Sequence, residues 1–216
     1  MRHLRAVAIG MLAMCLMATP LHAQDLAMTA VTQPLSGCAL SAAESVSVRI
    51  INYGPTLPAG TSFLTMYSIN SGPAVNEAVV LPNALPTHGV YIHTFAVAAD
   101  LSVAGSYSIL SSLNQIGDIN TGNNTIHSHA VHNSAPSAGG LLADTGSGGS
   151  GALTLSGHIG EVAQWEESPD AQRWFKLANT TTTQSYSDLG ATTHFRARVV
   201  NAPCAPALSN VVIVAP

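Results

Sequence analysis

The chain has few charged and few aromatic residues, and it is especially poor in basic ones. Asp, Glu, Lys and Arg make up 8% of the 216 residues, and Phe, Trp and Tyr make up 5%. Seven basic residues against eleven acidic ones give a formal net charge of −4 at pH 7. Such a chain lacks the positive surface that binding to nucleic acid or to an anionic membrane requires. We therefore expect neither as a partner.

Long apolar runs are missing apart from one near the N-terminus. Ala6–Met17 follows two arginines and is too short to span a bilayer comfortably. A positive start, an apolar run and a small residue at Ala23 are typical of a secretory signal peptide. We expect residues 1–23 to be cleaved, which leaves a mature chain without a membrane span. A retained membrane anchor and a lipid-modified Cys15 are the alternatives.

No segment shows a sustained helical period, so no long helix is expected. Short alternations of apolar and polar residues recur instead, with turn residues between them. In Glu44–Asn52, for example, Val46, Val48 and Ile50 fall on one face of an extended strand. Turn signals return roughly every 8–12 residues, as in an antiparallel β-sandwich. The sequence therefore predicts an all-β chain.

One tyrosine stands in a position that is typical of immunoglobulin-like sandwiches. In Asp100–Tyr107, a glycine precedes Tyr107 by two residues at the start of an apolar alternation. This resembles a tyrosine corner, in which the tyrosine hydroxyl bonds back to the preceding loop. In the second half of the chain, Phe195 occupies the matching place, so no such hydroxyl is expected there.

A change of composition at His132–Gly140, rich in Ser, Ala and Gly, divides the mature chain. We place the first domain at residues 24–133, a linker at 134–140 and the second domain at 141–216. Both parts contain strand-like alternations, and Trp165 lies where a sandwich keeps its central aromatic residue. Each part has a length within the usual range for one domain.

Both parts resemble modules of bacterial surface proteins. The first contains LSGCALSAAESVSVRIINYG, YIHTFAVAADLSVAGSYSI and GDINTGNN, and it resembles the cell-adhesion-related domain of bacteria. The second contains SGALTLSGHIGEVAQWEES, TTTQSYSDLGATTHFRARVVN and SNVVIV, and it resembles the immunoglobulin-like repeats of large secreted adhesins. The resemblance implies two tandem immunoglobulin-like antiparallel β-sandwiches with an adhesive or spacing role. It names no ligand, because such folds host many functions.

Only three cysteines are present, and Cys15 lies in the predicted signal peptide. Cys38 and Cys204 remain, one in each predicted domain. The adhesin repeats usually have an early cysteine that pairs with the late one, but Thr145–Ser147 stands in its place here. Cysteines in separate domains are not expected to come within disulfide distance. We therefore expect two buried free thiols, and the absence of a Cys/His cluster indicates no zinc site.

Asp144, Thr145 and Gly146 form the triplet of aspartic proteases, in which two aspartates share one proton. Only one such triplet is present, and no supporting apolar-apolar-Gly segment follows it. The same three residues are also typical of a Gly-rich turn between two strands. We expect Asp144 to be an exposed or turn-capping residue without a catalytic role.

Two polar segments have spacings that suit metal ions. His127 and His129 share one face of a strand near His132, which is a spacing that zinc accepts, but no carboxylate or cysteine nearby completes the site. Asp118, Asn120, Asn123 and Asn124 lie in one loop and offer oxygen ligands for Ca²⁺. Only one of them is charged, and Asp and Asn also cap turns without any ion. Calcium at Asp118, Asn120 and Asn123 stays open; no metal or other cofactor is otherwise expected.

The sequence predicts a surface for contact with other molecules in the second domain. Glu166, Glu167 and Asp170 form an acidic cluster on an apparent loop beside Trp165, and Trp174 lies among charged neighbours. Loops of a sandwich present binding surfaces, and aromatic residues are frequent in them. We expect Trp174, Glu166, Glu167 and Asp170 to contact a surface protein or polysaccharide.

These features predict a secreted, non-catalytic spacer or adhesion protein at the cell surface or in the extracellular matrix. No pair of acid–base groups is placed together, as an enzyme would require. The alternative is an accessory carbohydrate-binding protein that stacks sugars on Trp174 and an edge strand. Trp165, Trp174 and Tyr186 together also have the composition of a sugar-stacking platform, although a tryptophan in the place of Trp165 is more often a core residue. The oligomeric state is not indicated by the sequence.

Overall fold

The structure is a computed structural model that describes residues 23–216, so the predicted signal peptide lies outside the described residues apart from Ala23. The described part is all β, with a single short 3-10 helix, η1 (Thr121–Asn123), and no α-helix. No helix in residues 23–216 has the length and apolarity to cross a membrane. The predicted all-β class is confirmed.

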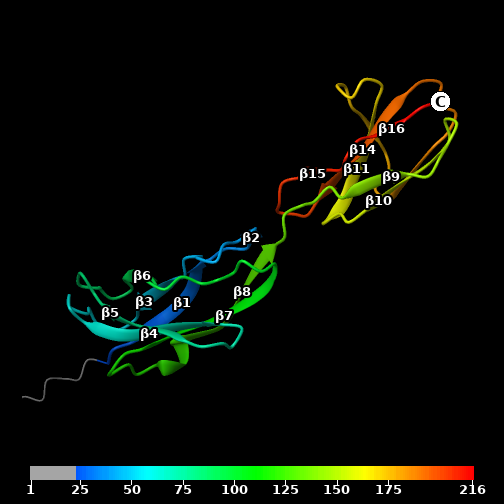
Figure 1. Ribbon diagram of the computed structural model, residues 1–216. Coiled ribbons are helices and arrows are strands. Elements are labelled where there is room, and N and C mark those ends of the chain that lie inside the picture. The colour runs from blue at the N-terminus through cyan, green and yellow to red at the C-terminus, as the bar shows by residue number, and fades with distance from the viewer. Residues whose placement is uncertain (1–22) are drawn as a thin grey trace, which may run out of the picture.

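The first module, formed by strands β1 to β8, is a sandwich of two sheets (Figure 1). One sheet has the order β1-β3-β6 and the other has the order β2-β8-β7-β4-β5. All neighbours are antiparallel except β2 and β8, which are parallel. The strands are β1 (Leu26–Gln33), β2 (Gly37–Cys38), β3 (Ser47–Asn52), β4 (Ser62–Ile69), β5 (Val75–Val80), β6 (Val90–Thr94), β7 (Gly105–Asn114) and β8 (Thr125–Ser134).

The core of the first module follows from the alternation seen in the sequence. Val46, Val48 and Ile50 are all fully buried around β3, while Arg49 between them is exposed. Side chains of Phe63, Tyr67 and other apolar residues from the facing sheet complete the core. Burial of alternate apolar residues is the main favourable contribution to such a sandwich.

The predicted tyrosine corner is present. Tyr107 lies near the start of β7, and its hydroxyl donates a hydrogen bond of 2.6 Å to the carbonyl oxygen of Val103. The bond fixes the loop that leads into β7. This is a second expectation from the sequence that the structure confirms.

The second module, formed by strands β9 to β16, is a smaller sandwich. One sheet has the order β13-β10-β9, and the other has the order β12-β11-β14-β15, with β16 also pairing with β14. The strands are β9 (Leu141–Asp144), β10 (Gly151–Ser156), β11 (Glu161–Ser168), β12 (Phe175–Leu177), β13 (Thr183–Tyr186), β14 (Thr193–Val200), β15 (Ala207–Leu208) and β16 (Val212–Val214).

Trp165 is the central aromatic residue of the second core, as its place in the sequence predicts. It is fully buried in the middle of β11, and its indole N–H donates to the carbonyl oxygen of Thr181 at 2.9 Å. Phe195 is buried beside it and stacks on Tyr186, with ring centroids 5.7 Å apart. The core of the second module shares no residue with the core of the first module.

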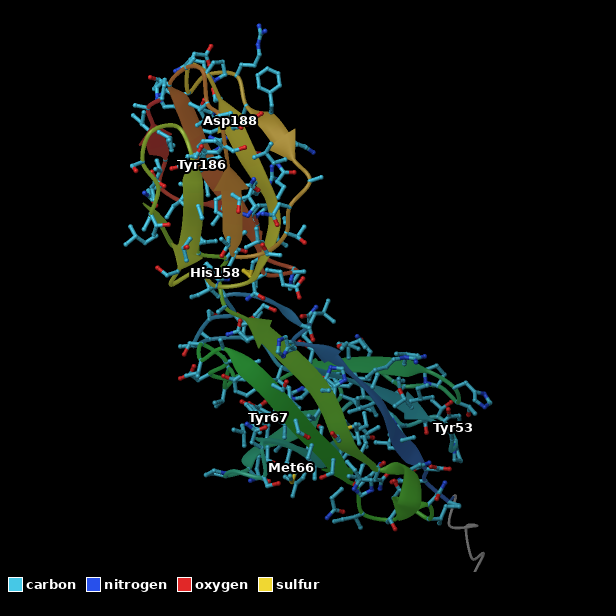
Figure 2. The ribbon with its side chains drawn as sticks, turned by 90° about the vertical axis from the view of Figure 1, so that its right-hand side faces the viewer. Tyr53, Met66, Tyr67, His158, Tyr186 and Asp188 are labelled. Carbon is cyan, nitrogen blue, oxygen red and sulfur yellow. A yellow bond between two sulfur atoms is a disulfide. The ribbon has the colours of Figure 1, made fainter. Side chains whose placement is uncertain are left out.

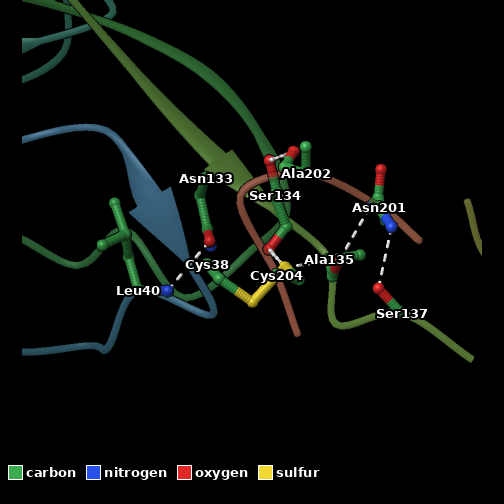
Figure 3. The surroundings of a disulfide bond; sticks show 9 residues. All are labelled: Cys38, Leu40, Asn133, Ser134, Ala135, Ser137, Asn201, Ala202 and Cys204. Carbon is green, nitrogen blue, oxygen red and sulfur yellow. Dashed lines mark hydrogen bonds between the residues drawn. A yellow bond between two sulfur atoms is a disulfide. The ribbon is translucent and has the colours of Figure 1, made fainter. Parts of the chain in front are cut away.

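The prediction of two free thiols is wrong, because Cys38 and Cys204 form a disulfide between the modules (Figure 3). Their Cα atoms are 5.0 Å apart although 166 positions separate them in the chain. Strand β2 pairs Cys38 with Ser134 at the end of β8, and Cys204 lies in the turn that follows β14. Both cysteines thus reach the place where the two modules meet, which their separation in sequence does not reveal.

The segment between β8 and β9 is held by hydrogen bonds (Figure 3). The side-chain amide of Asn201 donates to the carbonyl oxygen of Ala135 at 2.7 Å, and its backbone N–H donates to Ser137 Oγ at 2.8 Å. The hydroxyl of Ser134 donates to the carbonyl oxygen of Ala202 at 3.1 Å. A two-way backbone pair joins Ala138 to Ile159. The modules lie end to end, with His158 at the end of the second that faces the first (Figure 2).

Candidate functional site

Two of the residues expected to form the contact surface, Glu166 and Trp174, lie around Arg196 on the outer face of β11 and β14. Glu166 of β11 lies directly opposite Arg196 of β14, and Arg196 Nε donates to Glu166 Oε2 at 2.6 Å. The guanidinium carbon of Arg196 lies 3.8 Å from the ring centroid of Trp174. One cation thus bridges a carboxylate and an aromatic ring, which is a cation–π arrangement. The partner Arg196 was missed at the sequence level.

The structure differs from the expected loop position of the acidic cluster. Glu166 and Glu167 lie inside β11 rather than on a loop, and Glu166 is only 7% exposed. Its Oε1 accepts a hydrogen bond from the side-chain amide of Gln164. Ion pairing and this bond offset the cost of burying the carboxylate. The carboxylate of Glu166 is therefore bonded to groups of the protein itself, and it does not lie on an exposed loop.

Glu167 points to the opposite face of the sheet from Glu166, because successive side chains alternate along a strand. It lines an open hollow of about 340 Å³ at the end of the sandwich. The exposed ring of Phe175, which is opposite Glu167 in the strand pairing, forms part of the same hollow. Glu166 and Glu167 thus belong to two different surfaces.

Asp170 caps a turn. Its Oδ1 accepts the backbone N–H groups of Gln172 and Arg173, both at 2.9 Å, and the hydroxyl of Ser168 at 3.0 Å. The hydrogen bonds from the backbone of Arg173, from that of Gln172 and from Ser168 lower the pKa of Asp170 from its ordinary value. The carboxylate therefore shapes the loop that ends next to Trp174.

The aromatic residues do not form a three-ring platform. Trp165 and Tyr186 are both buried in the core, whereas Trp174 is only half-buried. Phe175, at 49% exposed, is the more open of the two adjacent rings. Trp174 lies over Arg196 and Phe175 lines the hollow with Glu167, so these two rings belong to different surfaces.

Asp144 lies at the end of β9, in front of the turn to β10. Its Oδ1 accepts the backbone N–H of Gly146 at 2.9 Å and the hydroxyl of Tyr186 at 2.7 Å. Burial, and then the hydrogen bond to Asp144, raise the pKa of Tyr186 to about 12. The exposed Asp144 side chain is thus a turn cap, in agreement with the sequence expectation.

The histidines of β8 stay apart from acidic groups. His127 and His132 are exposed, His129 is half-buried, and His132 Nδ1 is 3.0 Å from Ser106 Oγ. Across residues 23–216, no three side chains from His, Cys, Asp and Glu gather in a way that suits a metal ion.

The loop with the possible calcium ligands closes the far end of the first module. Asp118 Oδ1 accepts the backbone N–H of Asn120 at 2.9 Å, and its Oδ2 accepts that of Leu26 at 3.3 Å. Asn123 and Asn124 also face acidic side chains, while Asn120 is exposed. The structure therefore brings three of the four expected residues together and adds Asp25, which the sequence did not single out.

Comparisons with known proteins are in line with these modules but assign no activity. A family model described as a domain of unknown function (DUF8696) matches residues 143–215. No curated protein matches the chain. The family covers only the second module, so it does not classify the whole chain.

The similar solved structures are modules of immunoglobulin-like and fibronectin-like type. A CARDB domain from Pyrococcus furiosus, solved in complex with di-metal ions, is 17% identical with a TM-score of 0.37, over 53% of this chain and 97% of that one. A tetra-tandem repeat from the extending region of a large adhesion protein is 12% identical with a TM-score of 0.38, over 89% of this chain and 49% of that one. A two-domain fibronectin type III segment of chicken tenascin is 12% identical with a TM-score of 0.29, over 88% of this chain and 95% of that one.

Proposed function

We propose that the chain is an exported, non-catalytic protein that acts as a spacer or adhesion unit at the cell surface or in the extracellular matrix. The junction between the modules is the observation that supports this best. The linker and the Cys38–Cys204 disulfide give two covalent connections at one place, and Asn201 hydrogen-bonds the linker to the second module. A doubly connected joint limits bending, which suits a protein that holds its ends at a set distance.

Export is supported by the same disulfide. Disulfides persist in oxidising compartments and are rare where glutathione keeps thiols reduced. The apolar run Ala6–Met17 after two arginines supports the same route. This apolar run and the small residue Ala23 also support a mature chain that begins at Gln24.

The absence of catalysis is supported by the places where titrating groups are shifted. Catalytic sites gather such groups in one cleft. In the described part of the chain, burial raises the pKa of Tyr67, hydrogen bonds from Ser102 lower that of Asp100, and the other two shifted groups are Asp170 and Tyr186. They lie at four separate places, and Asp100 and Asp170 cap turns.

A contact with a surface protein or polysaccharide is the second part of the proposal. Glu167 and the exposed Phe175 line the hollow of about 340 Å³, whereas Trp174 lies over Arg196 on the other surface of the sheet. Glu166 and Asp170 take part indirectly, because one positions Arg196 under Trp174 and the other caps the preceding turn. The carbohydrate-binding alternative uses Trp174 and an edge strand.

Small-angle X-ray scattering tests the spacer proposal. The oxidised chain should scatter as one elongated particle, and a Cys38→Ser/Cys204→Ser double variant should show a broader range of interdomain distances while both modules stay folded. Identical scattering from the two proteins contradicts the proposal. Turnover of any substrate by the oxidised chain contradicts its non-catalytic part.

Binding to a glycan array tests the contact surface. Trp174→Ala should weaken binding to a polysaccharide, whereas Trp165 is unsuitable for such a test because it is buried. The matched control is Tyr53→Ala, an exposed aromatic residue in the other module. Equal binding by the wild-type and Trp174→Ala proteins places the contact elsewhere.

A further inference from the structure

A cluster of polar side chains closes the end of the first module that lies away from the junction (Figure 1). It forms where the residues before β1 meet the loop between β7 and β8, which contains η1. We call it the polar end cluster; its members are Gln24, Asp25, Gln115, Asp118, Asn123 and Asn124. The two carboxylates and four amides come from two segments about ninety positions apart in the chain.

Backbone contacts hold these two segments against each other. The backbone N–H of Ile119 donates to the carbonyl oxygen of Gln24 at 2.9 Å. The backbone N–H of Leu26 donates to Asp118 Oδ2 at 3.3 Å, and the side-chain amide of Gln115 donates to Gln24 Oε1 at 2.6 Å. The cluster is therefore a built part of the fold rather than a chance meeting of surface loops.

Three amide oxygens in the cluster are buried without a hydrogen-bond donor in the described part of the chain. They are Gln115 Oε1, Asn123 Oδ1 and Asn124 Oδ1. Asn124 is 4% exposed and Gln115 is 6% exposed, so water reaches neither freely. Buried acceptors are nearly always paired, and each exception calls for an explanation such as an ion or ordered water.

These oxygens lie close to the carboxylates. The amide nitrogen of Asn124 donates to Asp118 Oδ2 at 3.1 Å, and that of Asn123 donates to Asp25 Oδ1 at 2.8 Å. The oxygen and nitrogen of one planar amide are only about 2.3 Å apart. Each unpartnered oxygen of Asn123 and Asn124 is therefore within a few ångströms of a carboxylate.

No basic side chain neutralises the cluster in residues 23–216. The two ion pairs found there join His93 to Glu77 and Arg196 to Glu166, and neither touches Asp25 or Asp118. Two carboxylates and three unpaired acceptors thus lie in the polar end cluster with no basic side chain of the described residues paired to either carboxylate. A cation can pair with carboxylates and with amide oxygens at the same time.

We propose that the polar end cluster binds Ca²⁺. Calcium takes six to eight oxygen ligands in flexible geometry and accepts carboxylates and amide oxygens alike. Asp25 and Asp118 supply the charge, and Asn123, Asn124 and Gln115 supply neutral oxygens. Rotation of an Asn amide exchanges its oxygen and nitrogen at little steric cost, so both groups can turn their oxygens to the ion. Magnesium fits less well because it requires near-ideal octahedral geometry.

Bound calcium tightens the start of β1 against the loop before β8. An ion that binds only the folded chain stabilises it in proportion to ligand concentration. With two carboxylates, the affinity belongs to the weak class of extracellular modules, with a Kd on the order of 10⁻⁴–10⁻³ M.

Calorimetric titration of the chelator-treated chain with CaCl₂ tests the proposal, together with thermal unfolding in CaCl₂ and in MgCl₂. The wild-type chain should bind one Ca²⁺ in the first module and should melt several degrees higher in calcium than in magnesium. Asp118→Asn should weaken binding at least tenfold. The matched control is Asp100→Asn, which removes the same charge from another turn cap of this module and should leave calcium binding unchanged.

Asn123→Asp gives a gain of binding that misfolding does not mimic. A third carboxylate should lower the melting temperature without calcium, through repulsion from Asp25, and should enlarge the calcium-induced rise. Absence of heat and of any melting shift in the wild-type chain overturns the proposal. An equal calcium response in Asp118→Asn, or no increase in the response of Asn123→Asp, also overturns it.

Discussion

Glu166 and Glu167 are neighbours in sequence, yet they have different roles. Alternation along β11 sends Glu166 to the side of Arg196 and Trp174, and Glu167 to the hollow beside Phe175. An acidic pair that reads as one cluster in the sequence is thus two separate groups in the fold. The alternation in EVAQWEES indicates a strand through both residues, but the acidic cluster was interpreted as part of an apparent loop.

Replacement of Glu166 should therefore cost more stability than replacement of Glu167. Glu166→Gln leaves the guanidinium of Arg196 without its counter-charge in a mostly buried position, and it should lower the free energy of unfolding by about 1–3 kcal/mol. The matched control Glu167→Gln removes the same charge one position away. It should change the free energy of unfolding by less than about 0.5 kcal/mol. Urea unfolding of both variants measures the difference; equal losses would mean that the ion pair is unimportant.

The stability of the second module should fall at high pH because of Tyr186. Its pKa is raised to about 12 from the ordinary value of 10.0, so the folded state favours the neutral phenol. The contribution is fully present below about pH 10 and is lost as the pH rises toward about 12, since the unfolded chain releases this proton first. Urea midpoints measured across this range should fall more steeply for the wild-type chain than for Tyr186→Phe. If the urea midpoints of the wild-type chain and of Tyr186→Phe fall equally with pH, the raised pKa of Tyr186 does not contribute to the loss of stability.

Strands and their inward residues were the most predictable elements. The alternation around Val46, Val48 and Ile50 identified β3, and Gly105 before Tyr107 identified the start of β7. Both signals are local, because they depend on side-chain period and on turn chemistry. Pairing partners such as Arg196, thirty positions from Glu166, depend on register and do not appear in a local pattern.

The corner on β7 offers a test at the level of an element. Tyr107→Phe removes the hydroxyl that bonds to Val103, and it should lower the free energy of unfolding by about 1 kcal/mol. Tyr53→Phe is the matched control, because Tyr53 is exposed and its hydroxyl makes no hydrogen bond in residues 23–216. Guanidinium unfolding should separate the two variants. A loss in Tyr53→Phe as large as that in Tyr107→Phe would contradict a specific role for the corner.

At the scale of the whole molecule, the disulfide is the feature that sequence reasoning missed. Cys38 and Cys204 were assigned to different modules, and separate modules were expected to keep them apart. An even number of cysteines in an exported chain was the available signal for pairing. What it could not supply is that β2 and the turn after β14 both end at the junction.

The most direct test of the account is a peptide map, under non-reducing conditions, of the protein recovered from outside the cell. The account predicts a mature N-terminus at Gln24 and a single cross-linked peptide pair that contains Cys38 and Cys204, with no free thiol. Reduction should release the two peptides without changing any other mass. Free thiols at both positions, or disulfides that join two copies of the chain, would contradict a junction clamped within one molecule.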